Sequence, residues 1–278
     1  MNMTKEIEIA EVRKITELVK DQFDYDFSQY ALSSFRRRIA RILELHHIES
    51  VDGLLDRLSS ESHYFQEFLS EVTVNVTEMF RDYSFWTALK DDVFQRLSKS
   101  DLSKIKIWHA GCSSGEEVFS MCILLKEAGL LDRVEIIATD IDRRVISNAK
   151  KGLYMTKNME VNKKNYQSFN PNGDFDQYCT YGKDGVQMDL SLLDNVTFRT
   201  HNMITGIQND TFHLVLCRNV LIYFNQALQN KALKIIHQSM EKNGFLAIGS
   251  KESLLWCEYF SKFETISNEE KIFRKIKV

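Results

Sequence analysis

The chain has 278 residues, of which 44% are hydrophobic and 27% are charged, and its formal net charge is −3. This composition excludes a disordered chain, and the length allows one large domain or two modest ones. A near-neutral chain gives no reason to expect a general polyanion binder. No apolar run reaches the length of a membrane span, so we expect no membrane insertion. The N-terminal "MNMTKEIEIAEVRK" lacks an apolar core, so we expect no signal peptide. The five scattered cysteines form no CxxC pair or Cys/His cluster, which favours a reducing cytoplasmic setting without a metal site.

The first part of the chain carries patterns that are typical of helices alone. Apolar residues recur at three- and four-residue spacing in the first segment, at Ile7, Ile9, Val12, Ile15, Leu18 and Val19. Residues 28–47 repeat the pattern, and residues 50–58 and 64–72 are typical of shorter helices. We therefore predict a small helical domain over residues 1–72, followed by a connecting segment and helix over residues 73–103.

From residue 104 onward, strand-like apolar runs alternate with helical stretches. The runs begin at residues 104, 134, 195, 212 and 244, and the helical stretches follow Gly115, follow Asp142 and cover residues 226–240. This alternation predicts a parallel sheet covered on both faces. Residues 263–278 instead indicate two strands around a polar turn, so we expect the sheet to end in a hairpin. The polar, turn-rich residues 152–194 predict an insertion with a few short strands.

Six small residues, Ala110 to Gly115, follow the first strand of this predicted sheet. In open parallel sheets a ligand binds beyond the carboxyl ends of the strands, and small side chains let it approach the backbone closely. Glu116 and Glu117 occupy the first helical turn, where a phosphate would otherwise bind. Asp140 ends the next strand, where a carboxylate can accept hydrogen bonds from both ribose hydroxyls. These residues favour a cationic adenosyl ligand without phosphate, and S-adenosylmethionine fits.

A simpler explanation exists for the two acids in the first helical turn. Glu116 and Glu117 could merely complement the helix dipole, and Asp142 is the expected cap of the following helix. His109, close to the small-residue loop, is expected to be a structural histidine.

Four segments of the chain, taken together, resemble one family. They are "NVTEMFRD" from Asn75, "AGCSSGEE" from Ala110, "ATDID" from Ala138 and "CRNVLIYF" from Cys217. Their order and spacing resemble the CheR chemotaxis methyltransferases, which esterify glutamate side chains of bacterial chemoreceptors. The resemblance covers nearly the whole chain.

The resemblance implies an α/β fold of the class I S-adenosylmethionine-dependent methyltransferases. This is a Rossmann-like doubly wound sheet with a C-terminal antiparallel hairpin, here over residues 104–278, with a small β-subdomain inserted at about 152–194 and an all-α domain in front. The implied activity is that of a cytoplasmic protein-glutamate O-methyltransferase. It would form glutamate γ-methyl esters in sensory adaptation and release S-adenosylhomocysteine.

The resemblance also assigns site residues. The implied cofactor-binding set consists of Asn75, Thr77, Arg81, Gly111, Glu117, Asp140, Asn202, Met203, Asn219 and Val220. Arg81 and Tyr223 are implied to lie nearest the transferred methyl group and are the candidate catalytic residues. The plainer alternatives are helix caps for Asn75 and Thr77, turn residues for Asn202 and Asn219, a solvated arginine and a core tyrosine.

No general base is required for this reaction. A glutamate side chain has a pKa of about 4.3 and is already ionised at neutral pH. The lack of a Ser/His/Asp or Cys/His set is therefore expected. Arg81 is the candidate for orienting the acceptor carboxylate, because a guanidinium matches its two oxygens.

A basic stripe lies in the second predicted helix. With Phe35, Ile39 and Ile42 on the buried side, Arg37 and Arg41 fall on the opposite face and Arg38 lies beside them. A charged face of this kind is commonly only solubilising. The resemblance implies that it docks on the cytoplasmic helical region of membrane chemoreceptors.

We expect no nucleic-acid partner, because the chain lacks an aromatic stacking motif, and we expect a monomer. The inserted β-subdomain resembles one that, in some members of the family, grips the receptor's C-terminal peptide. The "TYGKDG" turn is shorter here than in those members, which predicts a form that does not need this peptide. Two alternatives stay open: an adaptor that binds the cofactor without catalysis, and a carboxyl methyltransferase with a different acceptor.

Overall fold

The computed structural model describes residues 7–61, 63–73, 76–99, 103–206 and 209–276. The chain divides into two compact units, one of Met1–Asn75 with Leu221–Gln229, and one of Val76–Val220 with Asn230–Val278. Within the described residues, no helix has the length and apolar character needed to cross a membrane.

The first unit is a helical bundle. Its helices are α1 (Ile9–Phe23), α2 (Leu32–Leu45), α3 (Val51–Ser60) and α4 (Tyr64–Val72). Their apolar stripes meet in one core that contains Ile15, Ile39 and Phe68, each of which is completely buried. Ile9 does not join this core, since it lies at the first turn of α1 and is half exposed.

A segment from far along the chain completes the first unit. The 3-10 turn η5 (Leu221–Tyr223) is tied to the loop before α2, where the Ala31 backbone N–H donates to the Tyr223 carbonyl at 2.8 Å. The Tyr30 and Phe224 rings lie 5.3 Å apart between centroids. The sequence pattern did not reveal this return of the chain, because its partners are not neighbours in sequence.

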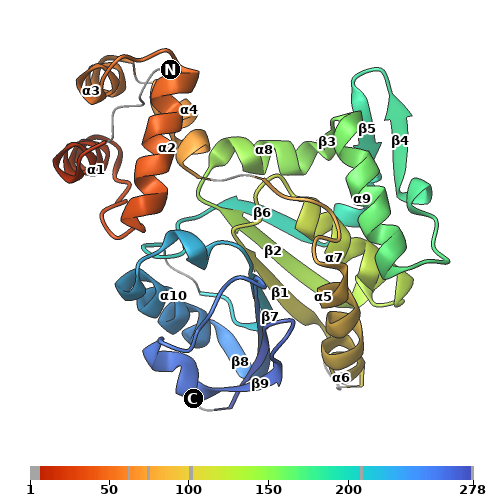
Figure 1. The fold of residues 1–278 in the computed structure, drawn as a ribbon. Coiled ribbons are helices and arrows are strands. Elements are labelled where there is room, and N and C mark those ends of the chain that lie inside the picture. Colours follow the sequence, from red (N-terminus) through yellow and green to blue (C-terminus); the bar gives the residue numbers. More distant parts are fainter. Residues whose placement is uncertain (1–6, 62, 74–75, 100–102, 207–208, 277–278) are drawn as a thin grey trace. The chain divides into compact units, whose positions relative to one another are not determined.

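The second unit contains the sheet (Figure 1). Its strands are β1 (Ile105–Ala110), β2 (Val134–Asp140), β6 (Val196–Thr200), β7 (Phe212–Cys217), β8 (Met240–Ile248), β9 (Phe263–Ser267) and β10 (Ile272–Lys275). Their order is β6-β2-β1-β7-β8-β10-β9. Strands β6, β2, β1, β7 and β8 are parallel, and β10 pairs antiparallel with both β8 and β9. The predicted parallel sheet with a C-terminal hairpin is confirmed.

Helices connect these strands. They are α7 (Glu116–Glu127), α8 (Arg143–Lys151) and α10 (Gln226–Gln238), preceded by α5 (Tyr83–Ala88), the π-helical turn η1 (Leu89–Phe94) and α6 (Gln95–Ser98). Short 3-10 turns are η2 (Leu131–Arg133), η3 (Phe175–Tyr178), η4 (Leu190–Leu193) and η6 (Glu258–Lys262). Asp142 caps α8 as expected, since its carboxylate accepts from the Arg144 N–H at 2.7 Å.

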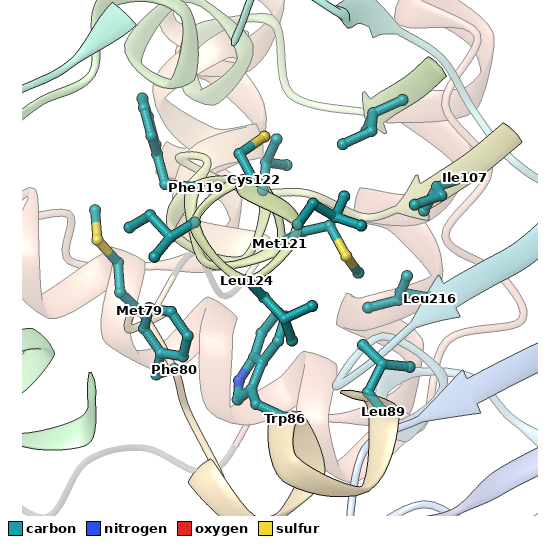
Figure 2. Close-up of a cluster of buried hydrophobic side chains, with 14 of the residues drawn as sticks. Met79, Phe80, Trp86, Leu89, Ile107, Phe119, Met121, Cys122, Leu124 and Leu216 are labelled. Carbon is teal, nitrogen blue, oxygen red and sulfur yellow. The ribbon is translucent and has the colours of Figure 1, made fainter. Parts of the chain in front are cut away.

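One large hydrophobic core surrounds α7. Figure 2 shows Met79, Phe80 and Trp86 from the segment before the sheet packed around this helix, with Ile107 and Leu216 from the strands beside it. Phe80 and Trp86 have no exposed surface. Burial of such aromatic side chains contributes a large share of the stability of a core. The connecting segment is thereby held against α7, the helix that follows the small-residue loop.

The insertion over residues 152–194 forms its own three-stranded sheet of β3 (Leu153–Tyr154), β5 (Gly185–Met188) and β4 (Cys179–Gly182), all antiparallel. The expected short strands are present. The sequence did not predict the long helix α9 (Thr156–Phe169), because few of its residues are apolar and only Met159, Asn162 and Tyr166 are buried. Tyr166 donates to Glu127 of α7 and so ties α9 to the main core.

Candidate active site

The small-residue loop lies at the switch point of the sheet. Strand β2 lies on one side of β1 and β7 on the other, so the loop after β1 and the loop after β7 open at the same edge. Gly111 has a φ of +89°, a conformation that favours glycine, and a Cβ atom placed there would lie 2.5 Å from Val220 Cγ2. Because glycine has no side chain, the backbone at Gly111 stays uncovered where the loop after β1 approaches the loop after β7.

Hydrogen bonds fix the shape of this loop. The backbone N–H groups of Gly111 and Cys112 both donate to the Thr139 carbonyl, at 2.8 and 2.9 Å. The Tyr154 hydroxyl donates to the Ser114 carbonyl at 2.8 Å. Ser113 has a φ of +48°, which is strained for a residue with a side chain. Its hydroxyl oxygen is buried without a hydrogen-bond partner in the described part of the chain.

Asp140 connects the ends of β1 and β2. One of its carboxylate oxygens accepts from the Ser113 N–H at 2.9 Å and the other from the Asp142 N–H at 3.0 Å. Burial raises the pKa of Asp140, and these two hydrogen bonds oppose that rise. Asp140 therefore joins the small-residue loop to the start of the segment that leads into α8.

The two acids at the start of α7 differ in environment. Glu116 is only 6% exposed, accepts a hydrogen bond from the Ser114 hydroxyl at 2.7 Å, and has a pKa raised to about 7 by burial. Glu117 keeps 17% of its side chain exposed and lies 2.9 Å from His109 Nδ1 and 3.1 Å from an Arg218 nitrogen. Burial opposes its ionisation, but the hydrogen bond from His109 and the charge of Arg218 prevail and lower its pKa.

The expectation that both acids repel phosphate therefore needs correction. Glu116 points into the protein, and the charge of Glu117 is balanced by Arg218. Of the two acids, Glu116 is buried and Glu117 is partly exposed. His109 is buried as expected of a structural histidine, although its Nε2 atom has no partner within the described residues.

Arg218 links three of the sequence motifs. Its guanidinium donates to Glu117 at 3.1 Å and to Asp82 at 2.8 Å, and it approaches the Arg81 carbonyl at 3.5 Å. Its central carbon lies 4.0 Å from the centroid of the Phe85 ring. The sequence predicts no role for this arginine, which lies in the segment "CRNVLIYF".

The turn that carries Arg81 is backbone-strained. Phe80 and Asp82, on either side of Arg81, have φ values of +52° and +56°. Such left-handed residues persist only where their surroundings hold them, and they gather at functional sites. Phe80 is held by its burial and by the Ser120 hydroxyl, which accepts from its N–H at 2.8 Å. Arg81 itself is half-buried, and its carbonyl accepts from the Trp86 indole at 3.0 Å.

The loop after β7 carries Asn219 and Val220, both half-buried. Asn219 is left-handed, with a φ of +61°, and its N–H donates to Glu252 at 2.9 Å. Glu252 also accepts from the Gly249 N–H at 2.5 Å. This buried carboxylate, for which the sequence predicts no role, fixes the backbone of Asn219, the residue before Val220.

The remaining sequence candidates occupy varied positions. Asn202 accepts from the Ile204 N–H at 2.9 Å, which is a turn contact, and Met203 beside it is buried. Both follow β6, whose end is joined to β2 by the hydrogen bond from the His201 N–H to the Asp140 carbonyl. Thr77 is half-buried. Asn75 lies outside the described residues.

The other candidates belong to the first unit. Tyr223 is half-buried, with its carbonyl held by Ala31. Arg37 and Arg41 are exposed on α2 as expected, while Arg38 is partly buried and its Nε atom has no partner among the residues described.

The strand order with its antiparallel hairpin, and the bare loop at the switch point, define a class I S-adenosylmethionine-dependent methyltransferase. Residues 75–272 match the family described as CheR methyltransferase, SAM binding domain, and residues 10–73 match CheR methyltransferase, all-alpha domain. The chain therefore belongs to the CheR methyltransferase family, and S-adenosylmethionine is its cofactor.

Several known proteins are similar to this chain. A putative methyltransferase, Cher3, from Pseudomonas putida is 40% identical over 265 residues, covering 95% of this chain and 96% of the relative. The chemotaxis protein methyltransferase of Listeria monocytogenes is 29% identical, covering 86% of this chain and 88% of the relative. Among solved structures, the N-methyltransferase NodS from Bradyrhizobium japonicum with S-adenosyl-L-homocysteine matches at a TM-score of 0.40 and 12% identity, covering 70% of this chain and 86% of that one.

Proposed function

We propose that this protein transfers the methyl group of S-adenosylmethionine to glutamate side chains on the cytoplasmic helices of chemoreceptors, as a step of sensory adaptation in chemotaxis. The observation that carries the proposal is the Arg81 turn. Asp82 in this turn and Glu117 at the cofactor loop both bind Arg218, so the turn is fixed beside the loop. This supports the proposal that Arg81, whose guanidinium suits an anion, serves beside a methyl-donor site.

The proposed cofactor contacts follow from the geometry of the loop. Asp140 would accept the ribose hydroxyls and Glu117 would face the cationic methionine portion, while Gly111 and Val220 would line the bare backbone. The bound cofactor supplies an electrophilic methyl group on a sulfonium sulfur. The other proposed contacts are Asn75, Thr77, Asn202, Met203 and Asn219.

The protein's part in the reaction is orientation. The acceptor glutamate is ionised at neutral pH, so no residue needs to remove a proton. Arg81 would hold the carboxylate by its guanidinium, with one oxygen directed at the methyl group and in line with the leaving sulfur. Tyr223 is the second proposed catalytic residue, because the family resemblance implies that it lies nearest the transferred methyl group, where its hydroxyl would serve the methyl site or the carboxylate. We assign these two residues the catalytic roles.

The docking surface is proposed from charge. Arg37 and Arg41 are exposed on α2 and Arg38 is partly exposed, which suits an acidic helical surface on the receptor. Relatives named chemotaxis protein methyltransferases support this acceptor, including the Listeria monocytogenes protein and one from Pseudomonas aeruginosa that is 29% identical over 235 residues.

A second acceptor class is favoured by one observation. The relative that is 40% identical is named only as a putative methyltransferase, Cher3, and this name gives no acceptor. Carboxyl methylation of another acidic protein is therefore the second candidate function.

The test is methyl transfer from labelled S-adenosylmethionine to a receptor cytoplasmic fragment, with the ester released as methanol by mild base. Arg81→Ala and Tyr223→Phe should each lower kcat by about 100-fold while largely sparing S-adenosylhomocysteine binding. Arg144→Ala, at an exposed position of the same unit as Arg81, is the control. Base-stable label on the wild-type product would exclude ester formation. Label on a different acidic protein, with none on the receptor, would favour the second candidate.

A further inference from the structure

Arg218 is a buried cation in the middle of the candidate site. Its side chain keeps only 2% of its exposed surface, and Asp82 and Glu117 keep 34% and 17% of theirs. A buried guanidinium is costly unless carboxylates compensate it, and here two do so from different parts of the chain. The nitrogen that binds Asp82 is not the nitrogen that binds Glu117.

The two carboxylates that bind Arg218 belong to different parts of the candidate site. Glu117 lies at the start of α7 beside the cofactor loop, and its other oxygen is paired with His109. Asp82 lies in the strained turn that carries Arg81, and it has no side-chain capping bond to the following helix α5. The contact with Arg218 is therefore what holds the Asp82 side chain. The approach of Arg218 to the Arg81 carbonyl adds a second attachment to the same turn.

A point charge at position 218 could not hold both carboxylates as the guanidinium does. The planar guanidinium reaches both acids with separate nitrogens and lays its face on the Phe85 ring. A lysine ammonium in the same space is a point charge without a fixed fork, so it can pair with one acid but cannot fix the separation of the two.

We propose that Arg218 is a positioning residue that fixes the Arg81 turn relative to the cofactor acid Glu117. Occupation of the cofactor site is in this way transmitted to the turn that orients the acceptor. The statement about the acceptor rests on the proposed function, whereas the link between Glu117 and the turn does not.

The structure supplies a reporter for this link. The Trp86 indole N–H donates to the Arg81 carbonyl at 3.0 Å. The NMR signal of this N–H group, observed in a proton–nitrogen correlation spectrum, therefore reports on the conformation of the Arg81 turn. The resonance can be assigned by its loss in Trp86→Phe. In the wild type, addition of S-adenosylhomocysteine should shift it.

The test compares Arg218→Lys with the wild type. Arg274→Lys is the control, because Arg274 pairs with Glu264 in the C-terminal hairpin. Arg218→Lys should bind S-adenosylhomocysteine in calorimetry within about threefold of the wild type and lose the ligand-induced shift of Trp86, while kcat falls by about tenfold or more. Arg274→Lys should change none of the three.

An intact ligand-induced shift in Arg218→Lys would overturn the inference, as would a wild-type kcat. Should that variant fail to fold, Asp82→Asn weakens the contact between Arg218 and the Arg81 turn from the side of the turn. It should likewise leave S-adenosylhomocysteine binding nearly unchanged and lower kcat. If the wild type methylates no receptor fragment, the proposed function fails, and the Trp86 shift still decides the role of Arg218.

Discussion

Replacement of Glu116 by glutamine tests the assignment of this residue as a buried, readily protonated acid. The carboxyl is 6% exposed, and its pKa is raised by burial from 4.5 to about 7. Glutamine has nearly the same shape, and its side-chain oxygen can accept the hydrogen bond that Ser114 donates. The substitution thus removes the charge and keeps the packing.

The direction in which pH changes the folding stability follows from the raised pKa of Glu116. Because the folded protein binds this proton more tightly than the unfolded chain, the contribution of Glu116 to stability is fully present below pH 4.5 and is lost as the pH rises to about 7. Since each pKa unit is worth about 1.4 kcal/mol, ionisation costs the folded state about 3 kcal/mol. Glu116→Gln should therefore be the more stable protein at pH 8, by up to about 3 kcal/mol, and should show little gain at pH 5.

Urea unfolding of the protein without cofactor, at pH 5 and at pH 8, measures this difference. The neighbouring substitution Glu117→Gln is the matched comparison, because the pKa of Glu117 is lowered and its charge balances Arg218. It should destabilise the protein at pH 8 by about 1–3 kcal/mol. Equal stability of Glu116→Gln and the wild type at both pH values would refute the assignment of a buried acid with a raised pKa.

Two further changes address the loop and the basic stripe. Gly111→Ala should weaken S-adenosylhomocysteine binding by more than about tenfold in calorimetry, because it adds a Cβ atom 2.5 Å from Val220 Cγ2 at a φ of +89°. Gly129→Ala is the control, because Gly129 has a φ of +65° and comparable backbone strain, but nothing lies within 4 Å of the added Cβ atom. We expect unchanged S-adenosylhomocysteine binding in Gly129→Ala and weakened binding in Gly111→Ala. Joint replacement of Arg37, Arg38 and Arg41 by glutamate should raise KM for the receptor and reduce the dependence of KM on salt, without changing cofactor affinity. Replacement of the exposed Lys231 and Lys234 of α10 is the control, and an unchanged KM in the triple variant would remove the docking role.

The sequence predicted the strands because each central strand is a short apolar run with a clear end. It also placed the loop after β1 and Asp140 correctly, since both positions follow directly from where those strands stop. Helix α9 was missed because its burial depends on partners such as Glu127, which binds Tyr166, and not on an apolar stripe of its own.

The sequence was less informative about charge. Glu116 and Glu117 are adjacent, and neighbouring residues of a helix point about 100° apart, so one is buried and the other faces the site. Arg218 could not be distinguished from a solvated arginine, because its two carboxylates come from distant parts of the chain. Its role became visible only when the fold placed them together.

The return of residues 221–229 to the helical unit has a consequence for protein engineering. Exchange of residues 1–75 alone between relatives would separate the Tyr30 ring from Phe224 and Gln29 from Asn225, which lie in the returning segment. A working chimera must therefore inherit both stretches from the same parent, and the crossover points belong after Val220 and after Gln229.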